Sequence, residues 1–214
     1  MQVVIAGGHG QIALRLARLL SERGERVRSL IRNPDHASDV SETGAESVVF
    51  DLEDQSAEEL ASVVQGADAV VFAAGAGPGS GPERKRTVDL GAAVKLAEAA
   101  SSAGVRRYVM VSSIGADNPA GGGETMRPYL EAKAEADAAV VASGLDYTIV
   151  RPGPLTNDPG TSRVTVGEDV GRAEVTRDDV AAVLVAVLDE PRTVGKTFVL
   201  VGGETPIPSA LAQL

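Results

Sequence analysis

A tyrosine and a lysine stand four residues apart in the segment Tyr129-Leu130-Glu131-Ala132-Lys133. Residues with this spacing share one face of a helix, so the Lys133 ammonium would stabilise negative charge on the Tyr129 oxygen. A phenol placed in this way could pass a proton to a substrate oxygen while a hydride moves to or from the attached carbon. Ser113, sixteen positions before Tyr129, could hold that oxygen by a hydrogen bond. These three residues are our catalytic hypothesis; the alternative is a purely structural pair, because the spacing also arises by chance on many helices.

A glycine-rich turn near the start of the chain is the second candidate for chemistry. Gly7-Gly8-His9-Gly10-Gln11-Ile12-Ala13 follows the apolar run Val3-Val4-Ile5-Ala6 and leads into an amphipathic stretch. A strand that ends in closely spaced glycines and opens a helix presents backbone N–H groups and a helix N-terminus, which suits a pyrophosphate. Two spacings fit, Gly8-x-Gly10-x-x-Ala13 and Gly7-x-x-Gly10-x-x-Ala13. The serine, tyrosine and lysine further along favour the second.

Positions just after the next two strands would contact the adenosine half of such a dinucleotide. Arg32 stands where a protein specific for NAD would carry Asp or Glu to bind the ribose hydroxyls. An arginine complements a 2′-phosphate, so we expect NADP in preference to NAD; the alternative is a solvated surface arginine. Asp51 could accept from the adenine amine with Leu52 against the ring, or Asp51 could cap the following helix.

Strand and helix signals alternate along the whole chain. Helices are expected from about residue 56 and at residues 83–103, 129–143 and 178–188, with Pro128 near the first turn of the third. Strict alternation predicts an α/β fold with a Rossmann-like doubly wound parallel sheet and helices on both faces. After the first strand, the others are expected at residues 26–31, 48–50, 68–74, 107–111, 147–150 and 197–201, in the order 3-2-1-4-5-6-7.

Several segments fit no crossover helix. Residues 156–176 are assigned to a small substrate-side segment with a short extra strand at residues 163–166. The Gly/Pro-rich stretches at residues 75–82 and 119–123 are short enough to be loops, so residues 1–214 are expected to form a single domain. The triple glycine at 121–123 could be a mobile lid or merely a flexible loop. Arg151 is expected in a structural ion pair.

Composition excludes several classes of function. The chain has 214 residues, 43% of them hydrophobic, and a formal net charge of -10, which opposes nucleic acid as a partner. It contains no cysteine and only two histidines, which excludes thiolate and His-rich metal sites. No run approaches the roughly 20 apolar residues that span a bilayer, and the first residues carry no signal-peptide pattern, so we expect a cytoplasmic protein without membrane contact.

Taken in order, the motifs resemble the atypical short-chain dehydrogenase/reductase superfamily. More narrowly, they are similar to its small single-domain NAD(P)-binding proteins, which are often labelled sugar epimerases and are related to NmrA-like regulators and biliverdin reductase B. The resemblance covers nearly the whole chain. It is carried by the segments GGHGQIA, IRNP, VVFDLED, VVFAAG, VDLGA, YVMVSSIGADNP, YLEAK and IVRPGPL.

The resemblance implies a role for each motif. The glycine turn would hold the phosphates, Arg32 the 2′-phosphate and Asp51-Leu52 the adenine, while Ser113, Tyr129 and Lys133 would be catalytic. Proline and glycine after the sixth strand would lie along the nicotinamide. The expected cofactor-binding residues are Gly7, His9, Gly10, Gln11, Ile12, Arg32, Asp51, Leu52, Ala73, Ala74, Gly75, Val111, Lys133, Pro152, Gly153 and Leu155. For His9, an exposed loop position without phosphate contact is the alternative.

One residue and the chain length depart from the family pattern. Asp89 stands where the family has an asparagine, which puts the asparagine-dependent proton relay in doubt. A chain of 214 residues leaves little room for the large carboxyl-terminal domain that binds nucleotide sugars in extended epimerases.

Three functions remain in competition. The first is an NADP-dependent oxidoreductase acting on a small carbonyl, quinone-like or flavin-like substrate. The second is a non-catalytic NADP(H) sensor, which would act through a protein partner or as a homodimer. The third is a sugar epimerase or dehydratase, which the short carboxyl-terminal segment disfavours. Retention of Tyr129 and Lys133 favours the enzyme.

Overall fold

The core of the protein is one large sheet built from short apolar strands. The computed structural model describes residues 1–77 and 79–214. The strands of the main sheet are β1 Gln2–Ala6, β2 Arg26–Ile31, β3 Glu46–Val49, β4 Ala69–Phe72, β5 Arg107–Val111, β6 Asp146–Pro152, β8 Arg163–Gly167, β10 Lys196–Gly202 and β11 Thr205–Pro206. They lie in the order β11-β8-β10-β6-β5-β4-β1-β2-β3. Every residue of β4 is buried, as expected for a parallel strand covered on both faces.

The predicted strand order is confirmed for the seven parallel strands. Read from β3 to β10, the strands follow the predicted order 3-2-1-4-5-6-7, where β10 is the predicted seventh strand. Each neighbouring pair is parallel. The sheet then continues further than predicted, because β8 pairs antiparallel with β10 and β11 pairs antiparallel with β8. The predicted extra strand at residues 163–166 therefore extends the main sheet. Its assignment to a substrate-side segment stays a prediction.

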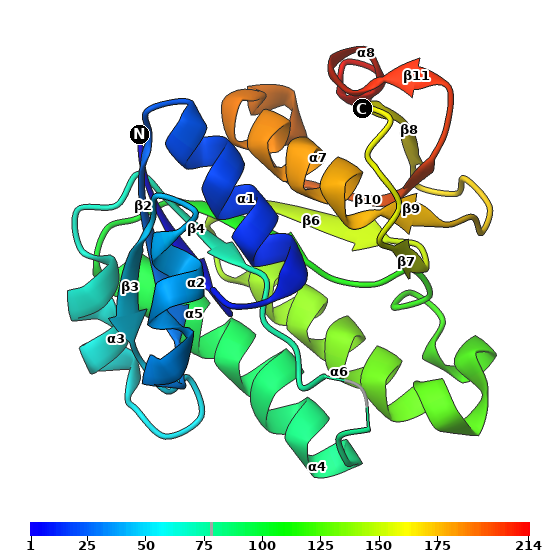
Figure 1. The fold of residues 1–214 in the computed structure, drawn as a ribbon. Coiled ribbons are helices and arrows are strands. Elements are labelled where there is room, and N and C mark those ends of the chain that lie inside the picture. The colour runs from blue at the N-terminus through cyan, green and yellow to red at the C-terminus, as the bar shows by residue number, and fades with distance from the viewer. Residues whose placement is uncertain (78) are drawn as a thin grey trace.

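Helices cover both faces of the sheet, as predicted (Figure 1). Side chains alternate along β1, so that Val3 and Ile5 face one layer and Val4 and Ala6 face the other. The first layer contains α1 (Gln11–Glu22), α7 (Arg177–Asp189) and the short α8 (Ile207–Leu211). The second contains α3 (Ala57–Val64), α5 (Ala93–Ser102) and α6 (Gly123–Ala142). Because the seven strands from β3 to β10 are parallel, their carboxyl ends and the loops that follow them share one edge.

The helix predicted at residues 83–103 has three parts. It begins as α4 (Pro82–Arg84), continues as a π-helical segment, Lys85–Ala92, and ends as α5. The predicted loop at residues 75–82 therefore ends one residue earlier, and Pro78 within it lies outside the described residues. A π-helix changes the direction of its side chains relative to an α-helix, and such segments are frequent at functional sites. It is this segment that carries Asp89.

The helix predicted to start at Tyr129 begins earlier. It starts at Gly123, so Pro128 lies inside α6 and not near its first turn. Residues 123–127 are all exposed, and an exposed turn carries no apolar periodicity to predict it. The triple glycine at 121–123 spans the end of a 3₁₀ turn, Pro119–Gly122, and the first residue of α6, so it is not an irregular loop. Movement of this segment as a lid stays a prediction.

Smaller elements complete the fold. A 3₁₀ turn at Pro34–His36 and α2 (Ala37–Ser41) follow β2, and the Asn33 side chain caps this stretch by accepting from the Asp35 N–H at 3.0 Å. The helix expected from about residue 56 is α3, and it begins with a capping box in which Ser56 and Glu59 exchange hydrogen bonds of 3.2 and 2.8 Å. Two short strands, β7 (Leu155–Thr156) and β9 (Val175–Thr176), form a separate parallel pair. None of the described helices combines the length and apolarity needed to cross a bilayer.

Candidate functional site

The glycine turn joins β1 to α1 in a conformation that a side chain would obstruct. Gly7 has φ of +81°, and a Cβ there would lie 2.5 Å from the Ala74 backbone. A Cβ on Gly8 would lie 2.6 Å from the Ser29 side chain, and the Gly8 N–H donates to Leu30 at 2.8 Å. Gly10 precedes the first residue of α1, and within the described chain no side chain caps that helix start. The turn therefore presents a bare helix N-terminus on a tightly packed backbone, which fits a pyrophosphate.

Replacing Gly8 with alanine tests whether this packing matters. The added methyl group would meet Ser29 on β2, and we expect a loss of about 1–3 kcal/mol in the free energy of unfolding, the usual effect of overpacking. Chemical denaturation measures this. Gly81→Ala is the matched control, because φ at Gly81 is -69° and no described atom lies within 4 Å of the added Cβ. Equal stabilities of the two variants would show that the turn has room to move.

A cleft of about 310 Å³ opens beside this turn and gathers most of the residues predicted to bind the adenosine half. The predicted residues that line it are Gly7, His9, Gly10, Arg32, Asp51, Leu52, Ala73, Ala74 and Gly75. Its other lining residues, which the sequence analysis did not include, are Leu30, Ile31, His36, Phe50, Glu53, Arg84 and Val88. Gln11 and Ile12 lie on the first turn of α1, next to this cleft but not in its lining.

His9 is partly exposed at the edge of the cleft. Its ring stacks on His36 at 3.6 Å between ring centroids, and its Nε2 lies 2.7 Å from Asp39 Oδ2. Its side chain is 34% exposed. The structure therefore gives His9 protein partners from the segment after β2, and contact with a phosphate stays a prediction.

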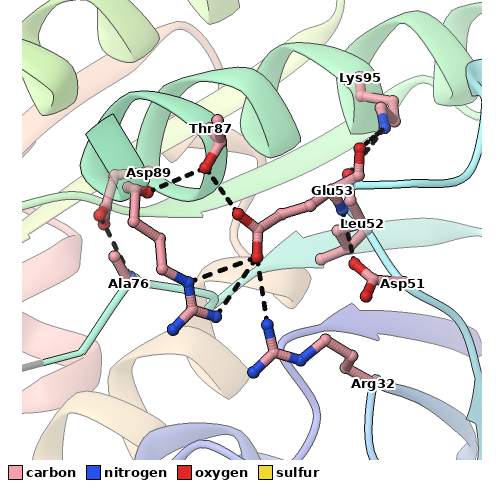
Figure 2. Close-up of polar contacts among 9 residues, drawn as sticks. Arg32, Asp51, Leu52, Glu53, Ala76, Thr87, Asp89 and Lys95 are labelled. Atoms are coloured by element: carbon pink, nitrogen blue, oxygen red, sulfur yellow. Dashed lines mark hydrogen bonds and ion pairs between the residues drawn. The ribbon is translucent and has the colours of Figure 1, made fainter. Parts of the chain in front are cut away.

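Glu53 is the centre of the polar contacts at the far end of the cleft (Figure 2). Its Oε2 accepts from Arg32 Nη1 at 3.2 Å and from Arg84 Nη2 at 3.3 Å. Its Oε1 accepts from the Thr87 hydroxyl at 2.6 Å. Arg32 is 56% exposed, so it is both a surface arginine and an ion-pair partner. No sequence motif singled out Glu53 or Arg84. The contacts join residues after β2, after β3 and at the end of α4, and these three segments are far apart in the chain.

The loop that carries Glu53 is held in place by backbone contacts. Lys95 on α5 donates to the carbonyl oxygens of Leu52, Glu53 and Gln55 at 2.8, 3.2 and 2.5 Å. Asp51 Oδ1 accepts from the Glu53 N–H at 2.8 Å, as Figure 2 shows. Asp51 therefore caps the turn in its own loop, while the following helix α3 is capped by Ser56. Contact of Asp51 with adenine stays a prediction.

Lys133 lies beneath the second half of the site and is almost completely buried. Its Nζ donates to the Val111 carbonyl at 3.2 Å and lies 3.2 Å from Asp89 Oδ1. The side chains of Lys133 and Asp89 are 3% and 1% exposed. Asp89 Oδ2 also accepts from the Ala76 N–H at 3.2 Å (Figure 2). This carboxylate therefore joins the lysine to the loop after β4. Asp89 thus occupies the asparagine position as the counter-ion of the lysine.

Tyr129 and Ser113 lie in the same region, but no direct contact joins them among the described hydrogen bonds. Tyr129 is half-buried, and its ring centroid lies 5.9 Å from Lys133 Nζ. The Ser113 hydroxyl donates to the Ile114 carbonyl at 3.3 Å, a weak contact. The predicted spacing of Tyr129 and Lys133 on one helix face is therefore present. A substrate oxygen would have to join the tyrosine to the serine.

Pro152, Gly153 and Leu155 are not in the lining of the cleft, and their contact with a cofactor stays a prediction. The Ile114 N–H donates to the Pro152 carbonyl at 2.9 Å and the Gly153 N–H donates to Leu200 at 2.9 Å, while Leu155 is 38% exposed. A Cβ on Gly153 would clash with the Ala173 carbonyl, so the glycine allows a close approach of backbone at this point.

Arg151 forms the structural ion pair that was predicted. Its Nε donates to Asp137 Oδ2 at 2.9 Å beneath α6. Burial raises the pKa of Asp137 above its usual range, while the nearby Ser112 hydroxyl and the Arg151 guanidinium act in the opposite direction.

Known proteins similar to this chain carry epimerase, dehydratase and oxidoreductase names. The YhfK protein of Bacillus subtilis (strain 168), which is named an uncharacterized sugar epimerase, is 41% identical over 215 residues, with 100% of both chains covered. A solved structure from Bacillus halodurans, named as a candidate NAD-dependent epimerase/dehydratase, is 39% identical with a TM-score of 0.94 and covers 100% of both chains. The oxidoreductase ylbE from Lactococcus lactis is 29% identical with a TM-score of 0.89, covering 100% of this chain and 96% of the other.

The family comparison covers most of the chain. The sequence profile of the family described as NAD(P)H-binding matches residues 7–191, from the glycine turn to the end of α7 and the residues after it. Because the profile spans both halves of the site and the relatives are similar along their whole length, this chain belongs to the NAD(P)H-binding family, which fits the atypical short-chain dehydrogenase/reductase branch expected from its motifs.

Proposed function

We propose that this protein is an NADP-dependent oxidoreductase that acts on a small carbonyl, quinone-like or flavin-like substrate. The observation that carries the proposal is the placement of Lys133. Its ammonium is buried at the carboxyl end of β5, in contact with the Val111 carbonyl, one helical turn from Tyr129. The same edge of the sheet carries the glycine turn and the cleft that contains Arg32. The proton-transfer residues and the nucleotide cleft thus share one edge, as the reaction requires.

Each residue has a defined task in this proposal. The N–H groups at the start of α1 hold the pyrophosphate, and Arg32 supplies positive charge for a 2′-phosphate. When bound, NADPH supplies the hydride. Tyr129 donates a proton to the substrate oxygen, Lys133 stabilises the negative charge left on the tyrosine, and Ser113 holds that oxygen by a hydrogen bond.

Asp89 gives the lysine a different environment from the one an asparagine would give. A buried carboxylate 3.2 Å from Nζ pairs with the lysine and holds it against the end of β5. The same carboxylate contacts the Ala76 N–H in the loop after β4, next to the predicted cofactor-binding residues Ala73, Ala74 and Gly75. We infer that Asp89 positions Lys133 relative to the bound nucleotide, and that proton exchange with solvent does not use the asparagine route.

Arg32→Ala tests the cofactor assignment. We expect wild-type protein to bind NADPH more tightly than NADH, and the variant to lose about 10- to 100-fold in NADPH affinity, because a hydrogen bond to a charged group is worth roughly 1.5–3 kcal/mol. NADH affinity should change little. Equilibrium titration by nucleotide fluorescence measures both dissociation constants. Arg26→Ala is the matched control, since Arg26 is an exposed arginine at the opposite end of the same strand. Equal dissociation constants for NADPH and NADH in the wild type would contradict the assignment.

The two other candidate functions predict different outcomes for the same cofactor. An NADP(H) sensor would bind NADPH but leave it unoxidised with every substrate. A sugar epimerase, the activity in the name of the Bacillus subtilis relative, would return the hydride to its substrate and consume no NADPH overall. Net oxidation of NADPH by an added aldehyde, quinone or flavin is therefore the outcome specific to the oxidoreductase.

A further inference from the structure

We propose that Glu53 is an internal competitor for the 2′-phosphate of NADP, and that Arg84 is a second binding residue for that phosphate beside Arg32. The inference rests on the proposed function, because it concerns the same nucleotide cleft. The inference assigns roles to Glu53 and Arg84, which the family resemblance did not include. With Glu53 in place, the preference for NADP is weaker than Arg32 and Arg84 alone would produce.

The first argument is the convergence of positive charge on one oxygen. Arg32 follows β2 and Arg84 ends α4, yet both guanidinium groups reach Glu53 Oε2, at 3.2 Å and at 3.3–3.4 Å. All three residues line the cleft. A point at which two arginines meet a single anionic oxygen has the chemistry of a phosphate site, and the carboxylate occupies it.

The second argument concerns charge. The two guanidinium groups share the single carboxylate of Glu53, which leaves most of their N–H donors open to a second anion. The other carboxylate in the lining, Asp51, forms no ion pair with either arginine among the described residues and accepts from the Glu53 N–H. A phosphate that hydrogen-bonds to both arginines must come close to the oxygen that they already share, and two anions at that distance repel each other. Full contact of the phosphate with both arginines therefore requires the Glu53 side chain to leave.

The third argument is that the side chain can leave while its backbone stays. The loop is held by the three Lys95 contacts to carbonyl oxygens and by the Asp51 contact to the Glu53 N–H. Beyond the backbone, the carboxylate is held by the two arginines and by the Thr87 hydroxyl, and the side chain is 23% exposed. Rotation toward solvent costs these contacts and leaves the fold intact. Each NADP that binds must meet this cost, and NAD does not.

The test uses adenosine 2′,5′-bisphosphate and adenosine 5′-monophosphate, which differ only in the 2′-phosphate and do not depend on turnover. Calorimetric titration gives both dissociation constants for each variant. We expect Glu53→Gln and Glu53→Ala to bind the bisphosphate more tightly by a factor on the order of ten, and Arg84→Ala to bind it more weakly by a similar factor. Affinity for the monophosphate should stay within about twofold, the size of a minor contact.

Matched controls come from an ion pair between the π-helical segment and α6. Arg86 and Glu135 contact each other at 3.0 Å outside the cleft, with side chains 58% and 49% exposed. Arg86→Ala and Glu135→Gln make the same charge changes without touching the site, and should leave the bisphosphate affinity unchanged.

The outcomes separate this inference from the proposed function. Weaker bisphosphate binding by Glu53→Gln would show that Glu53 holds the arginines in place, and unchanged binding by Arg84→Ala would remove Arg84 from the site; either result overturns the inference. Wild-type protein that binds the two probes equally would overturn the NADP assignment itself, and the inference with it.

Discussion

Tyr129→Phe is expected to lower the rate of NADPH oxidation by a factor of about 10²–10⁴, the usual contribution of a general acid or base. The phenol is the only proposed proton donor to the substrate oxygen, and it lies on the helix face that carries the buried Lys133. Phenylalanine keeps the ring and removes only the hydroxyl. Turnover followed by NADPH absorbance measures the change. The dissociation constant of NADPH should be unchanged, because the tyrosine acts on the substrate.

The matched control is Tyr147→Phe. Tyr147 is also half-buried, but it lies on β6 among the apolar side chains of the α3, α5 and α6 layer. Removal of the Tyr147 hydroxyl should leave the turnover rate within about twofold of wild type, because this residue does not touch the reacting atoms. If Tyr129→Phe retains wild-type turnover, Tyr129 is not the proton donor and the catalytic hypothesis fails.

Asp89→Ala is expected to destabilise the protein by about 3–5 kcal/mol, because it leaves a buried ammonium without its counter-ion. Lys133 Nζ and Asp89 Oδ1 lie 3.2 Å apart, and the two side chains are only 3% and 1% exposed, so solvent cannot replace the lost carboxylate. Urea denaturation gives the free energy of unfolding. Asp89→Asn should cost less, since the amide keeps the shape and the contact to the Ala76 N–H needs only an oxygen.

Two comparisons show whether the loss comes from the buried charge. Asp89→Leu combined with Lys133→Met removes both charges, and its stability should recover toward wild type, as buried ion pairs replaced by apolar residues usually allow. The exposed pair Arg127–Glu131 is the surface control, and Glu131→Ala should cost no more than about 1 kcal/mol. If Asp89→Ala also lowers the free energy of unfolding by no more than about 1 kcal/mol, water reaches the lysine when the carboxylate is absent, and the account of the buried pair is wrong.

The fold was largely predictable because its signals are local. Apolar runs such as Val3 to Ala6 are continuous in sequence and buried in the structure, and glycine turns separate them from helices. Elements with exposed residues were missed for the same reason. The first turn of α6 has no apolar face, and α2 buries only Val40. The antiparallel pairing of β8 and β11 depends on contacts between distant segments, which no local pattern contains.

The site was predictable where a motif specifies its own geometry. The glycine turn, Arg32 and the Tyr129–Lys133 pair each rest on spacing within one segment. Glu53 and Arg84 belong to no such motif. Their contacts form only because the segments after β2 and β3 and the end of α4 meet at the cleft. Asp89 was recognised as a departure, yet its contact with Lys133 depends on the π-helical segment, which sequence periodicity did not indicate. The substrate, the partners and the cytoplasmic location stay predictions.

The most direct test of the account is NADPH oxidation by the wild-type protein with a panel of small aldehydes, quinones and flavins. Binding of NADPH is verified first by titration, so that an absence of oxidation cannot be explained by an absence of bound cofactor. The account predicts net oxidation with at least one member of the panel, at a rate that falls in Tyr129→Phe but not in Tyr147→Phe. Tight binding of NADPH with no oxidation by any member would contradict it.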